Sequence, residues 1–369
     1  MSLGKFLRPN KVLVIFGPRQ VGKTTLLKDF LEKTKIKYRL DSGENLRVQR
    51  ILGSQDFEMI KEYAQGYKLI AIDEAQRIPQ VGMGLKILVD QNPGIKVIAT
   101  GSSSFELAGS IGEPLTGRKI TMTLFPVAQI ELAQLFNPEE MKNHLSRWLI
   151  FGGYPEVVTA EEKSEKIRII EELTNSYLLK DILELKRVKN SRILVDILRL
   201  LAFQIGSEVS LSEIGSKVGI DTKTVGRYLD LLEKSFVIFQ LRGYSRNLRS
   251  EMTKKSKYYF FDLGVRNAII SNFNSLELRN DIGGLWENFL IMERWKKRVY
   301  TDIPANMFFW RTWEQKEIDL VEEREGKLFG YEFKWSDAGK AKEPHIWTET
   351  YPEATWEIIS PKNYLRFIC

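Results

Sequence analysis

The sequence predicts an α/β protein, and three observations support this class. Residues 11–125 contain short apolar runs, such as Val12–Phe16 and Leu69–Ile72, separated by helical patterns. Such runs are typical of strands buried on both faces of a parallel sheet. Residues 138–205 are rich in helix formers, and from Tyr258 onward the chain becomes strand-rich and aromatic. We therefore expect a layered sheet-and-helix domain, then helices, then a smaller α/β region.

Length and composition narrow the class of protein. The chain has 369 residues, which predicts two or three domains. Its apolar fraction of 43% and charged fraction of 28% are those of soluble globular proteins. No run approaches the ~20 apolar residues of a membrane span, so we expect no membrane partner and a cytoplasmic location. The single cysteine, Cys369, and two distant histidines, His144 and His345, argue against a disulfide framework and a Cys/His metal site.

A glycine loop lies between the first predicted strand and a predicted helix. It fits the pattern G-x-x-x-x-G-K-[ST], in which glycines let backbone N–H groups point at phosphate oxygens and the helix N-terminus adds positive charge. Lys23 can reach the β- and γ-phosphates of ATP, and the Thr24 hydroxyl can ligate Mg²⁺. The predicted ATP-binding residues are Gly17, Pro18, Arg19, Gln20, Val21, Gly22, Lys23, Thr24 and Thr25.

Asp73 and Glu74 follow the apolar run Leu69–Ile72. A hydrophobic strand that ends in an acid places a carboxylate beside the Mg²⁺ of such a loop. We therefore predict Thr24 and Asp73 as Mg²⁺ ligands. Glu74 lies where a base can polarise the attacking water, so we predict Lys23 and Glu74 as catalytic residues.

Two further positions in this region are candidates for contact with a nucleotide. The run Val97–Ala99 leads into Thr100 and Ser102, and the carboxyl ends of parallel strands face the ligand crevice. Either hydroxyl could bind the γ-phosphate, or the segment could be an ordinary polar turn. Arg118 is a candidate catalytic arginine finger, in cis or from a neighbouring molecule, although a structural salt bridge is the simpler explanation.

Several motifs together carry a resemblance to a known family. The segments GPRQVGKTT, IDEAQRIP, ATGSSS and LTGRKITMTLFP resemble bacterial and archaeal AAA+-type ATPases that carry a C-terminal nuclease-like domain. The segment FGGYPE, residues 151–156, is similar to the GG-x-P element of their helical lid. The resemblance covers nearly the whole chain, and its ATPase half is the specific part. It implies five parallel strands followed by a helical lid.

The middle of the chain has the signature of a helix-turn-helix. Ser210 and Glu213 form a capping box, Gly219 marks a turn, and Asp221 caps a second helix from Thr222. Residues 236–244 would supply the wing of a winged helix, and 16 Lys/Arg against nine Asp/Glu over residues 180–260 favour contact with phosphates. The predicted DNA-contacting residues are Thr222, Lys223, Thr224, Arg227, Tyr228 and Arg242, extended by Arg246, Arg249, Lys254, Lys255 and Lys257.

The C-terminal part contains a short acidic pattern on two candidate strands. Asp319 and Glu332 can converge if the strands pair, Lys334 shares a face with Glu332, and Glu287 lies on a predicted helix. Three carboxylates and a lysine can bind Mg²⁺ and activate water for phosphodiester cleavage. The pattern is similar to the PD-(D/E)xK nuclease core, but it is short and degenerate. It is equally compatible with a charged surface hairpin or with a fold that only binds DNA.

These patterns predict four parts and leave three functions open. The parts are a P-loop AAA+-type ATPase core (1–130), a helical lid (131–180), a winged helix (181–245) and a nuclease-like α/β domain (246–369). We expect an ATP- and Mg²⁺-dependent ATPase associated with DNA. The alternatives are an ATP-dependent switch that binds a protein partner, and a DNA endonuclease gated by ATP. The sequence leaves the oligomeric state open.

Overall fold

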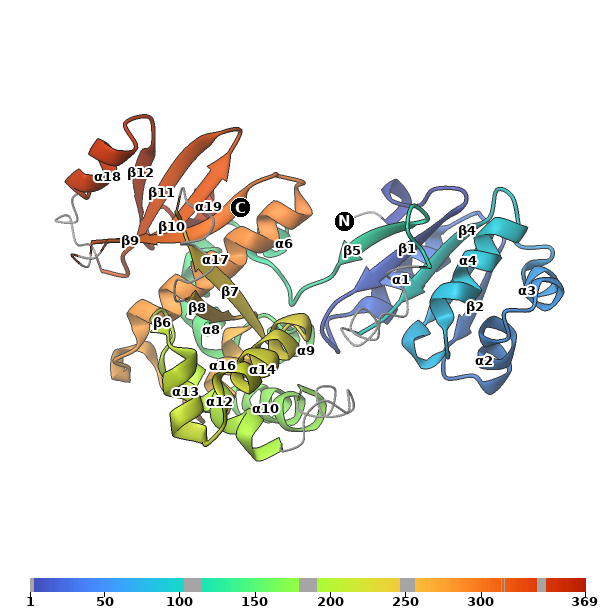
Figure 1. Cartoon of the computed structure of the whole chain (residues 1–369), viewed down its shortest axis with the longest axis horizontal. Helices are drawn as coiled ribbons and strands as arrows, with labels where there is room; N and C mark the ends of the chain where they lie inside the picture. Colours follow the sequence, from blue (N-terminus) through green and yellow to red (C-terminus); the bar gives the residue numbers. More distant parts are fainter. Residues whose placement is uncertain are drawn as a thin grey trace. The chain divides into compact units, whose positions relative to one another are not determined.

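The computed structural model describes residues 3–102, 114–178, 191–245, 256–312, 314, 316–336 and 343–369 (Figure 1). The chain divides into two compact units. The first is built on the chain up to Phe125, and the second begins at Pro126 and holds most of the remaining residues. The predicted boundary at residue 130 is thus close to the observed one. The predicted lid, winged helix and nuclease-like region, however, share one compact unit.

The first unit contains a five-stranded sheet in the order β2-β3-β4-β1-β5, and every neighbouring pair is parallel. The three inner strands are almost entirely buried, while the edge strands β2 and β5 are partly exposed. This explains why the inner strands read as continuous apolar runs. The predicted α/β class and the five parallel strands are confirmed. The strands are β1 (Lys11–Phe16), β2 (Tyr38–Ser42), β3 (Leu69–Asp73), β4 (Lys96–Thr100) and β5 (Lys119–Thr123).

Helices connect the strands of this sheet. Two of them have an N-cap side chain that accepts a hydrogen bond: Asn45 accepts from the N–H of Arg47 in α2, and Asp56 accepts from the N–H of Met59 in α3. The helices of the first unit are α1 (Lys23–Lys33), α2 (Leu46–Gly53), α3 (Phe57–Ala64) and α4 (Val81–Gln91), with short 3-10 turns η1 (Leu3–Lys5) and η2 (Ala75–Arg77).

The second unit contains a seven-stranded mixed sheet in the order β12-β11-β10-β9-β7-β8-β6. A parallel pairing of β7 with β9 joins a three-stranded part to a four-stranded part. The predicted boundary at residue 245 instead placed β6 and β7 in one domain, and β8 together with the four-stranded part in another. The strands are β6 (Glu208–Val209), β7 (Ile238–Gly243), β8 (Ser256–Phe260), β9 (Asn306–Arg311), β10 (Glu317–Arg324), β11 (Lys327–Phe333) and β12 (Thr355–Ile359).

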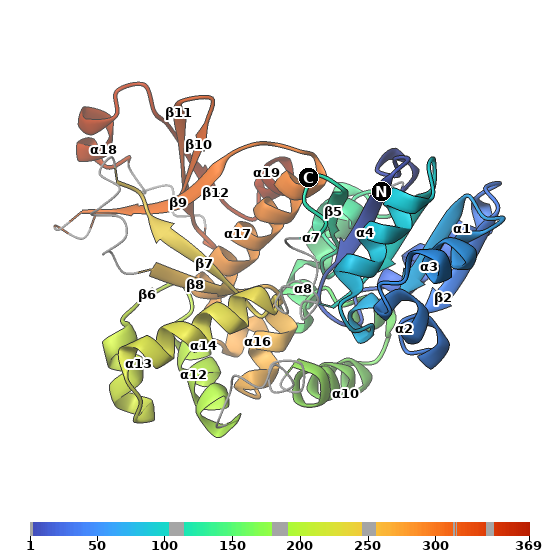
Figure 2. The ribbon, with the colours of Figure 1, turned by 45° about the vertical axis from the view of Figure 1, so that its right-hand side comes forward.

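Helices of the second unit pack on both parts of this sheet. Helix α17 contacts β8, β11 and the C-terminal helix α19, and Figure 2 shows α12, α13 and α14 gathered at the end of the unit that holds β6 and β8. The helices are α6 (Gln129–Leu132), α7 (Pro138–Asn143), α8 (Leu145–Phe151), α9 (Pro155–Thr159), α10 (Lys163–Glu172), α12 (Ser191–Phe203), α13 (Leu211–Val218), α14 (Thr222–Lys234), α16 (Leu263–Ile269), α17 (Ile282–Tyr300), α18 (His345–Thr350) and α19 (Tyr364–Ile368), with the π-helical η3 (Leu173–Leu178) and the 3-10 turn η4 (Leu276–Leu278).

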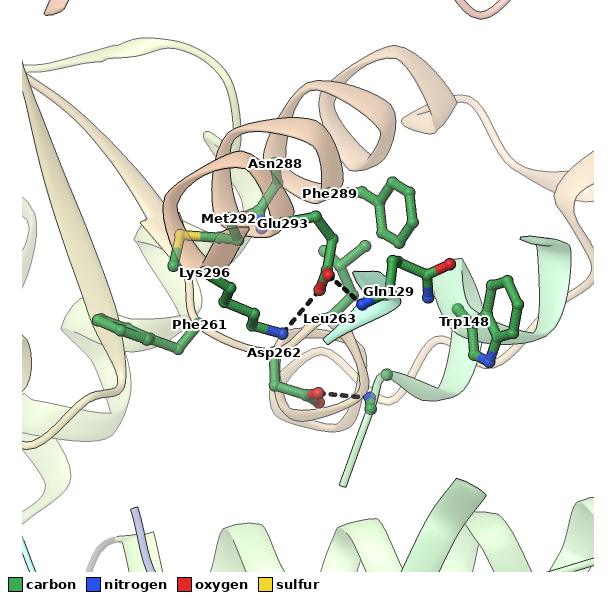
Figure 3. A pocket seen from close by; sticks show the side chains of 12 residues that line it. Gln129, Trp148, Phe261, Asp262, Leu263, Asn288, Phe289, Met292, Glu293 and Lys296 are labelled. Carbon is green, nitrogen blue, oxygen red and sulfur yellow. Dashed lines mark hydrogen bonds and ion pairs between the residues drawn. The ribbon is translucent and has the colours of Figure 1, made fainter. Parts of the chain in front are cut away.

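The GG-x-P element forms a buried joint inside the second unit (Figure 3). The N–H of Gly153 donates to Asp262 Oδ2 at 2.7 Å, and Asp262 also caps α16 by accepting from the N–H of Val265. A Cβ atom at Gly152 would collide with the Asp262 carboxylate, and Gly152 has a left-handed backbone with φ +75°. The glycines are therefore required by close packing of α8 against the start of α16.

A second buried anchor lies beside this joint. Glu293 accepts the N–H of Gln129 at 2.6 Å and the ammonium of Lys296 at 2.7 Å, as Figure 3 shows. Asn267 donates to the carbonyls of Leu149 and Ile150 at the end of α8. Helices that follow Pro126 in sequence are thus fixed by polar groups from α16 and α17. Among the helices described, none is both long and apolar enough to cross a bilayer.

Candidate nucleotide-binding site

The loop between β1 and α1 has the backbone that phosphate binding requires. Gly17 has φ +152°, and a Cβ there would collide with the carbonyl of Leu124 after β5. Gly22 has φ +93° in the left-handed region and directly precedes α1. Only glycine adopts both conformations without strain. The loop therefore presents the N-terminal amides of α1 at the carboxyl edge of the sheet.

Lys23 is the first residue of α1, and only 6% of it is exposed. Its ammonium donates to the carbonyls of Gly17 at 3.0 Å and Pro18 at 2.6 Å, so the side chain arches back over the loop. This position allows Lys23 to reach a phosphate held by the loop amides. Within the same loop the side chain of Val21 is buried, whereas Gln20 and Thr25 are exposed and Arg19 is half-buried.

Asp73 joins three elements at the carboxyl edge of the sheet. Its Oδ2 accepts the Thr24 hydroxyl at 2.8 Å, and its Oδ1 accepts the Thr100 hydroxyl. The N–H of Glu74 donates to the Thr100 oxygen at 3.1 Å. The structure thus brings together Thr24 from α1 and Asp73 from β3, which we predicted as neighbours. Thr100 from β4, for which a phosphate contact and an ordinary polar turn were both open, joins them. Ser102, which follows β4, is buried.

Glu74 has a left-handed backbone, with φ 51°, directly after β3. Its Oε2 accepts Gln76 Nε2 at 2.5 Å. Sequence reasoning missed Gln76; its position two residues after the acidic pair was the available signal. Gln76 restrains the carboxylate that we predicted as the base.

Arg118 lies at the amino-terminal ends of the parallel strands, opposite the ends that carry the glycine loop. It precedes β5 at Lys119, which pairs with Val12 near the start of β1, whereas the glycine loop follows the end of β1. Its Nε donates to Asp90 Oδ1 at 2.6 Å in a partly exposed ion pair. Arg118 thus forms a structural salt bridge, the simpler of the explanations given above, and the length of β1 separates it from the glycine loop. Action on a neighbouring molecule stays a prediction.

The C-terminal acids Glu287, Asp319 and Glu332 lie close enough for their charges to interact, and each has a partner within the chain. Glu287 on α17 accepts Lys257 Nζ at 2.8 Å and the Tyr259 hydroxyl at 2.6 Å. Asp319 accepts the N–H of Phe333 at 2.7 Å, and Glu332 pairs with Lys334 at 2.6 Å. In the parts of the chain that the structure describes, no three His, Cys, Asp or Glu side chains are arranged to hold a metal ion.

Burial and charge set the protonation of this cluster. Burial of Asp319, together with the charges of Glu287 and Glu332, raises its pKa well above the ordinary value. Burial alone would lower the pKa of Lys257, but the charges of Glu287, Glu317 and Asp319 outweigh it and raise this pKa. Lys257 therefore remains an ammonium ion at neutral pH.

Two of the predicted DNA-contacting residues are buried. Tyr228 is 6% exposed and Lys257 is 2% exposed, so neither can reach a phosphate. Tyr228 packs with the apolar side of α14, and Lys257 faces the acidic cluster. The remaining predicted contacts on α14 and β7 are exposed or half-buried, and these are Thr222, Lys223, Thr224, Arg227 and Arg242. Arg246, Arg249, Lys254 and Lys255 lie outside the described residues.

Three segments of the chain match known families. Residues 9–133 match the family described as AAA domain. Residues 142–276 match a domain of unknown function (DUF8612), and residues 282–359 match another (DUF4143). The AAA match spans all five strands of the first sheet.

The similarity to several proteins extends over most of the chain. The uncharacterized protein Rv2008c of Mycobacterium tuberculosis is 27% identical over 335 residues, covering 90% of this chain and 72% of the relative. An uncharacterized protein of Haemophilus influenzae is 25% identical over 342 residues, which cover 87% of this chain and 81% of that relative. A solved signal transduction ATPase with a tetratricopeptide repeat sensor, from Pyrococcus horikoshii, is 14% identical with a TM-score of 0.26. This chain covers 44% of that structure, and the similarity is too weak to add to the fold assignment.

The five parallel strands, the glycine loop with Lys23 and Thr24, and the adjacent Asp73 agree with the AAA match. Together they show that the first unit has the P-loop NTPase fold and that its residues 9–133 are similar to the AAA domain family.

Proposed function

We propose that this chain hydrolyses ATP with Mg²⁺ and that its second unit binds DNA. The observation that carries the DNA part is the exposed cationic face of α14. Lys223 and Arg227 lie one helical turn apart on that face, and both are exposed. The ATPase part rests on the geometry around the glycine loop.

The residues around the loop fit a nucleotide and its metal ion. The left-handed Gly22 and the amides of α1 suit an anion, and Lys23 already lies over the loop. Thr24 and Asp73 supply a hydroxyl and a carboxylate 2.8 Å apart, which are the hard oxygen donors that Mg²⁺ prefers. When bound, Mg²⁺ neutralises charge on the β- and γ-phosphates.

The protein's own groups then have separate roles in hydrolysis. Lys23 exchanges its bonds with the carbonyls of Gly17 and Pro18 for bonds with phosphate oxygens, which stabilises charge that develops on the leaving group. Glu74 orients the attacking water and accepts its proton. Thr100 fixes the position of Asp73 and of the Glu74 backbone.

The element order of the second unit supports a winged helix. Three helices and three strands follow one another as α12, β6, α13, α14, β7 and β8, and the strands pair in the order β7-β8-β6. Asp221 caps α14, accepting the N–H of Thr224 at 2.9 Å. We infer that α14 is the recognition helix and that the antiparallel strands β7 and β8 belong to the wing. The module would span residues 191–260 rather than 181–245.

The last part of the unit has the element order α17, β9, β10, β11, α18 and β12. Strands β9, β10 and β11 are antiparallel neighbours, and β12 is parallel to β11. This arrangement supports a nuclease-like fold. We propose it as part of the DNA-binding unit without cleavage, because its acids are engaged by cations.

The test is ATP turnover by the wild type and Glu74→Gln, each with no DNA and with duplex, single-stranded or branched DNA. We expect DNA to stimulate the wild type and Glu74→Gln to lose turnover while it retains nucleotide. DNA affinity should also change with bound nucleotide, because linkage between binding sites is reciprocal.

A matched control separates the two parts of the proposal. Lys223→Ala with Arg227→Ala should retain basal turnover and lose stimulation by DNA, whereas Lys33→Ala, which removes an exposed lysine paired with Asp29, should retain both. Turnover that ignores every DNA, together with no salt-sensitive DNA binding, would overturn the DNA part. That outcome would favour an ATP-dependent switch directed at a protein partner.

A further inference from the structure

A buried lysine lies among the acids of the second unit. Lys257 belongs to β8, in the three-stranded part of the sheet, and is 2% exposed. Its ammonium donates to Glu287 on α17 at 2.8 Å and contacts Glu317 at the start of β10. One ammonium therefore bridges acids from two elements that follow it in the chain.

The Glu287 carboxylate is enclosed on both sides. Its Oε1 accepts both Lys257 and the Tyr259 hydroxyl. Its Oε2 faces Gly206, where a Cβ atom would lie 2.8 Å from the oxygen. Gly206 has φ +77°, so a glycine is required there for its backbone as well as for this close approach. A divalent ion near Glu287 would have to displace the Lys257 ammonium.

The other acids of the cluster also have cationic or N–H partners. Glu317 Oε2 lies 3.6 Å from Arg311 Nε, and Glu332 Oε1 lies 2.6 Å from Lys334 Nζ. Asp319 accepts the N–H of Phe333. The four acids Glu287, Glu317, Asp319 and Glu332 thus share their surroundings with three cations of the chain itself, which are Lys257, Lys334 and Arg311.

We propose that the Lys257 ammonium takes the place of a divalent cation in this cluster, so that the acids form an ion-pair network and not a metal site. A divalent ion such as Mg²⁺ or Mn²⁺ needs several accessible oxygens at once. The contacts described above engage one oxygen each of Glu287, Asp319 and Glu332 with donors of the chain itself. The network instead ties β8 to α17 and β10, and it holds the two parts of the seven-stranded sheet together.

The test is a titration of the full, nucleotide-free chain with Mn²⁺. Electron paramagnetic resonance measures the concentration of free Mn²⁺, and the number of bound ions is obtained by difference. Four proteins are compared: the wild type, Asp319→Asn, Lys257→Met, and the double variant Lys257→Met/Asp319→Asn. Any Mn²⁺ bound near the glycine loop is common to all four and cancels in the comparison. We expect the wild type and Asp319→Asn to bind the same number of ions.

Lys257→Met should gain one Mn²⁺, and the double variant should lose it. Mn²⁺ should also raise the melting temperature of Lys257→Met by more than that of the wild type, because any ion near the glycine loop stabilises both proteins equally. The proposal is overturned if Asp319→Asn binds one Mn²⁺ fewer than the wild type, or if folded Lys257→Met gains no ion. If Lys257→Met does not fold, the wild type and Asp319→Asn still decide the question, and Lys257→Arg should match the wild type.

Discussion

The glycine loop and the C-terminal acidic cluster both place a buried lysine near carboxylates, but the two lysines have different partners. Lys23 donates to the carbonyls of Gly17 and Pro18, and Asp73 accepts hydroxyls from Thr24 and Thr100. In the cluster, Lys257 donates to carboxylates. A lysine that is bonded to neutral carbonyls can exchange them for a charged ligand at a low cost in free energy. A buried lysine that is paired with a carboxylate would leave that carboxylate without its partner if it bound a ligand, and the cost is then high.

This difference explains why similar residue types predict different chemistry. A site that binds an exchangeable ligand keeps its charged groups on weak, neutral partners until the ligand arrives. In the cluster, by contrast, the partners of Glu287, Glu317 and Glu332 are lysines and an arginine of the same chain, which are in place once the chain folds. Four predictions test how the sites of this molecule use their charged groups, and they are given from the largest expected effect to the smallest.

The largest effect is expected on catalysis. Glu74→Gln removes the proposed base and should lower kcat about 10²- to 10⁴-fold, the usual contribution of a positioned base. Glu287→Gln, in the cluster, should leave kcat within about twofold, because the group has no part in general base catalysis there. Steady-state ATP hydrolysis with both variants checks this. If kcat fell equally in Glu74→Gln and Glu287→Gln, the proposal that only Glu74 acts as the base would be contradicted.

The next effect is on stability. Lys257→Met leaves Glu287 and Glu317 without their buried partner and should cost about 3–5 kcal/mol of unfolding free energy. Lys23→Met should cost only about 1 kcal/mol, because it removes hydrogen bonds to carbonyls that water can replace. Urea unfolding followed by circular dichroism measures both. Glu287→Gln added to Lys257→Met should restore part of the loss, and a further loss would contradict the ion-pair account.

A smaller effect is expected on the salt dependence of DNA binding. Each phosphate contact contributes roughly −0.9 to the slope of log affinity against log salt concentration. Lys223→Ala and Arg227→Ala should each reduce the magnitude of the slope by about 1. Fluorescence anisotropy across a salt series checks this, with Lys33→Ala as the control. Unchanged slopes in both α14 variants would show that α14 does not contact phosphates.

The smallest effect concerns Asp281, which accepts Arg266 at 2.5 Å and Arg279 at 2.8 Å. Burial alone would raise the pKa of Asp281, but these two arginines outweigh it and lower the pKa to about 2. A lowered pKa stabilises the fold above the unfolded value near 4, and this stability is lost as the pH falls towards 2. Because the group is partly exposed, we expect about 1 kcal/mol.

Asp281→Asn should therefore be less stable than the wild type at pH 6, and the difference should shrink at pH 3. Urea unfolding at the two pH values measures this difference. A gap that stays constant with pH would show that the loss comes from packing or hydrogen bonding and not from the charge of Asp281.

The geometry of the candidate nucleotide site was predictable because the residues that form it are marked by local sequence patterns. Gly17 to Thr24 is one continuous segment that fits a known motif. Asp73, which accepts the Thr24 hydroxyl, directly follows a recognisable run of apolar strand residues, so both parts of the site can be located in the sequence. The same local reasoning failed for Lys257. Its neighbours Lys254 and Lys255 suggested a basic surface, but its orientation is set by β8 pairing with β7 and by acids 30 and 60 residues later.

Tertiary contacts explain the other differences as well. Tyr228 was assigned to the exposed face of its helix, yet its ring is buried, because the apolar side of α14 is wider than Val225, Leu229 and Leu232 indicated. Asp262 carried no sequence signal, since its role depends on two glycines more than 100 residues earlier. Contacts do not divide the second unit at the predicted domain boundaries, for the same reason. The pairing of β7 with β9 joins segments that no local pattern connects.

That pairing also limits how the protein can be divided experimentally. The matched family segments end at 276 and begin at 282, between β8 and β9, so sequence comparison suggests a cut there. A cut at that point would leave β7 and β9 as open sheet edges, and open edges promote aggregation. A fragment that stops near residue 276 would also lack the acids that pair with Lys257. Truncation series and fusion partners are therefore best placed ahead of Pro126, where the compact unit begins.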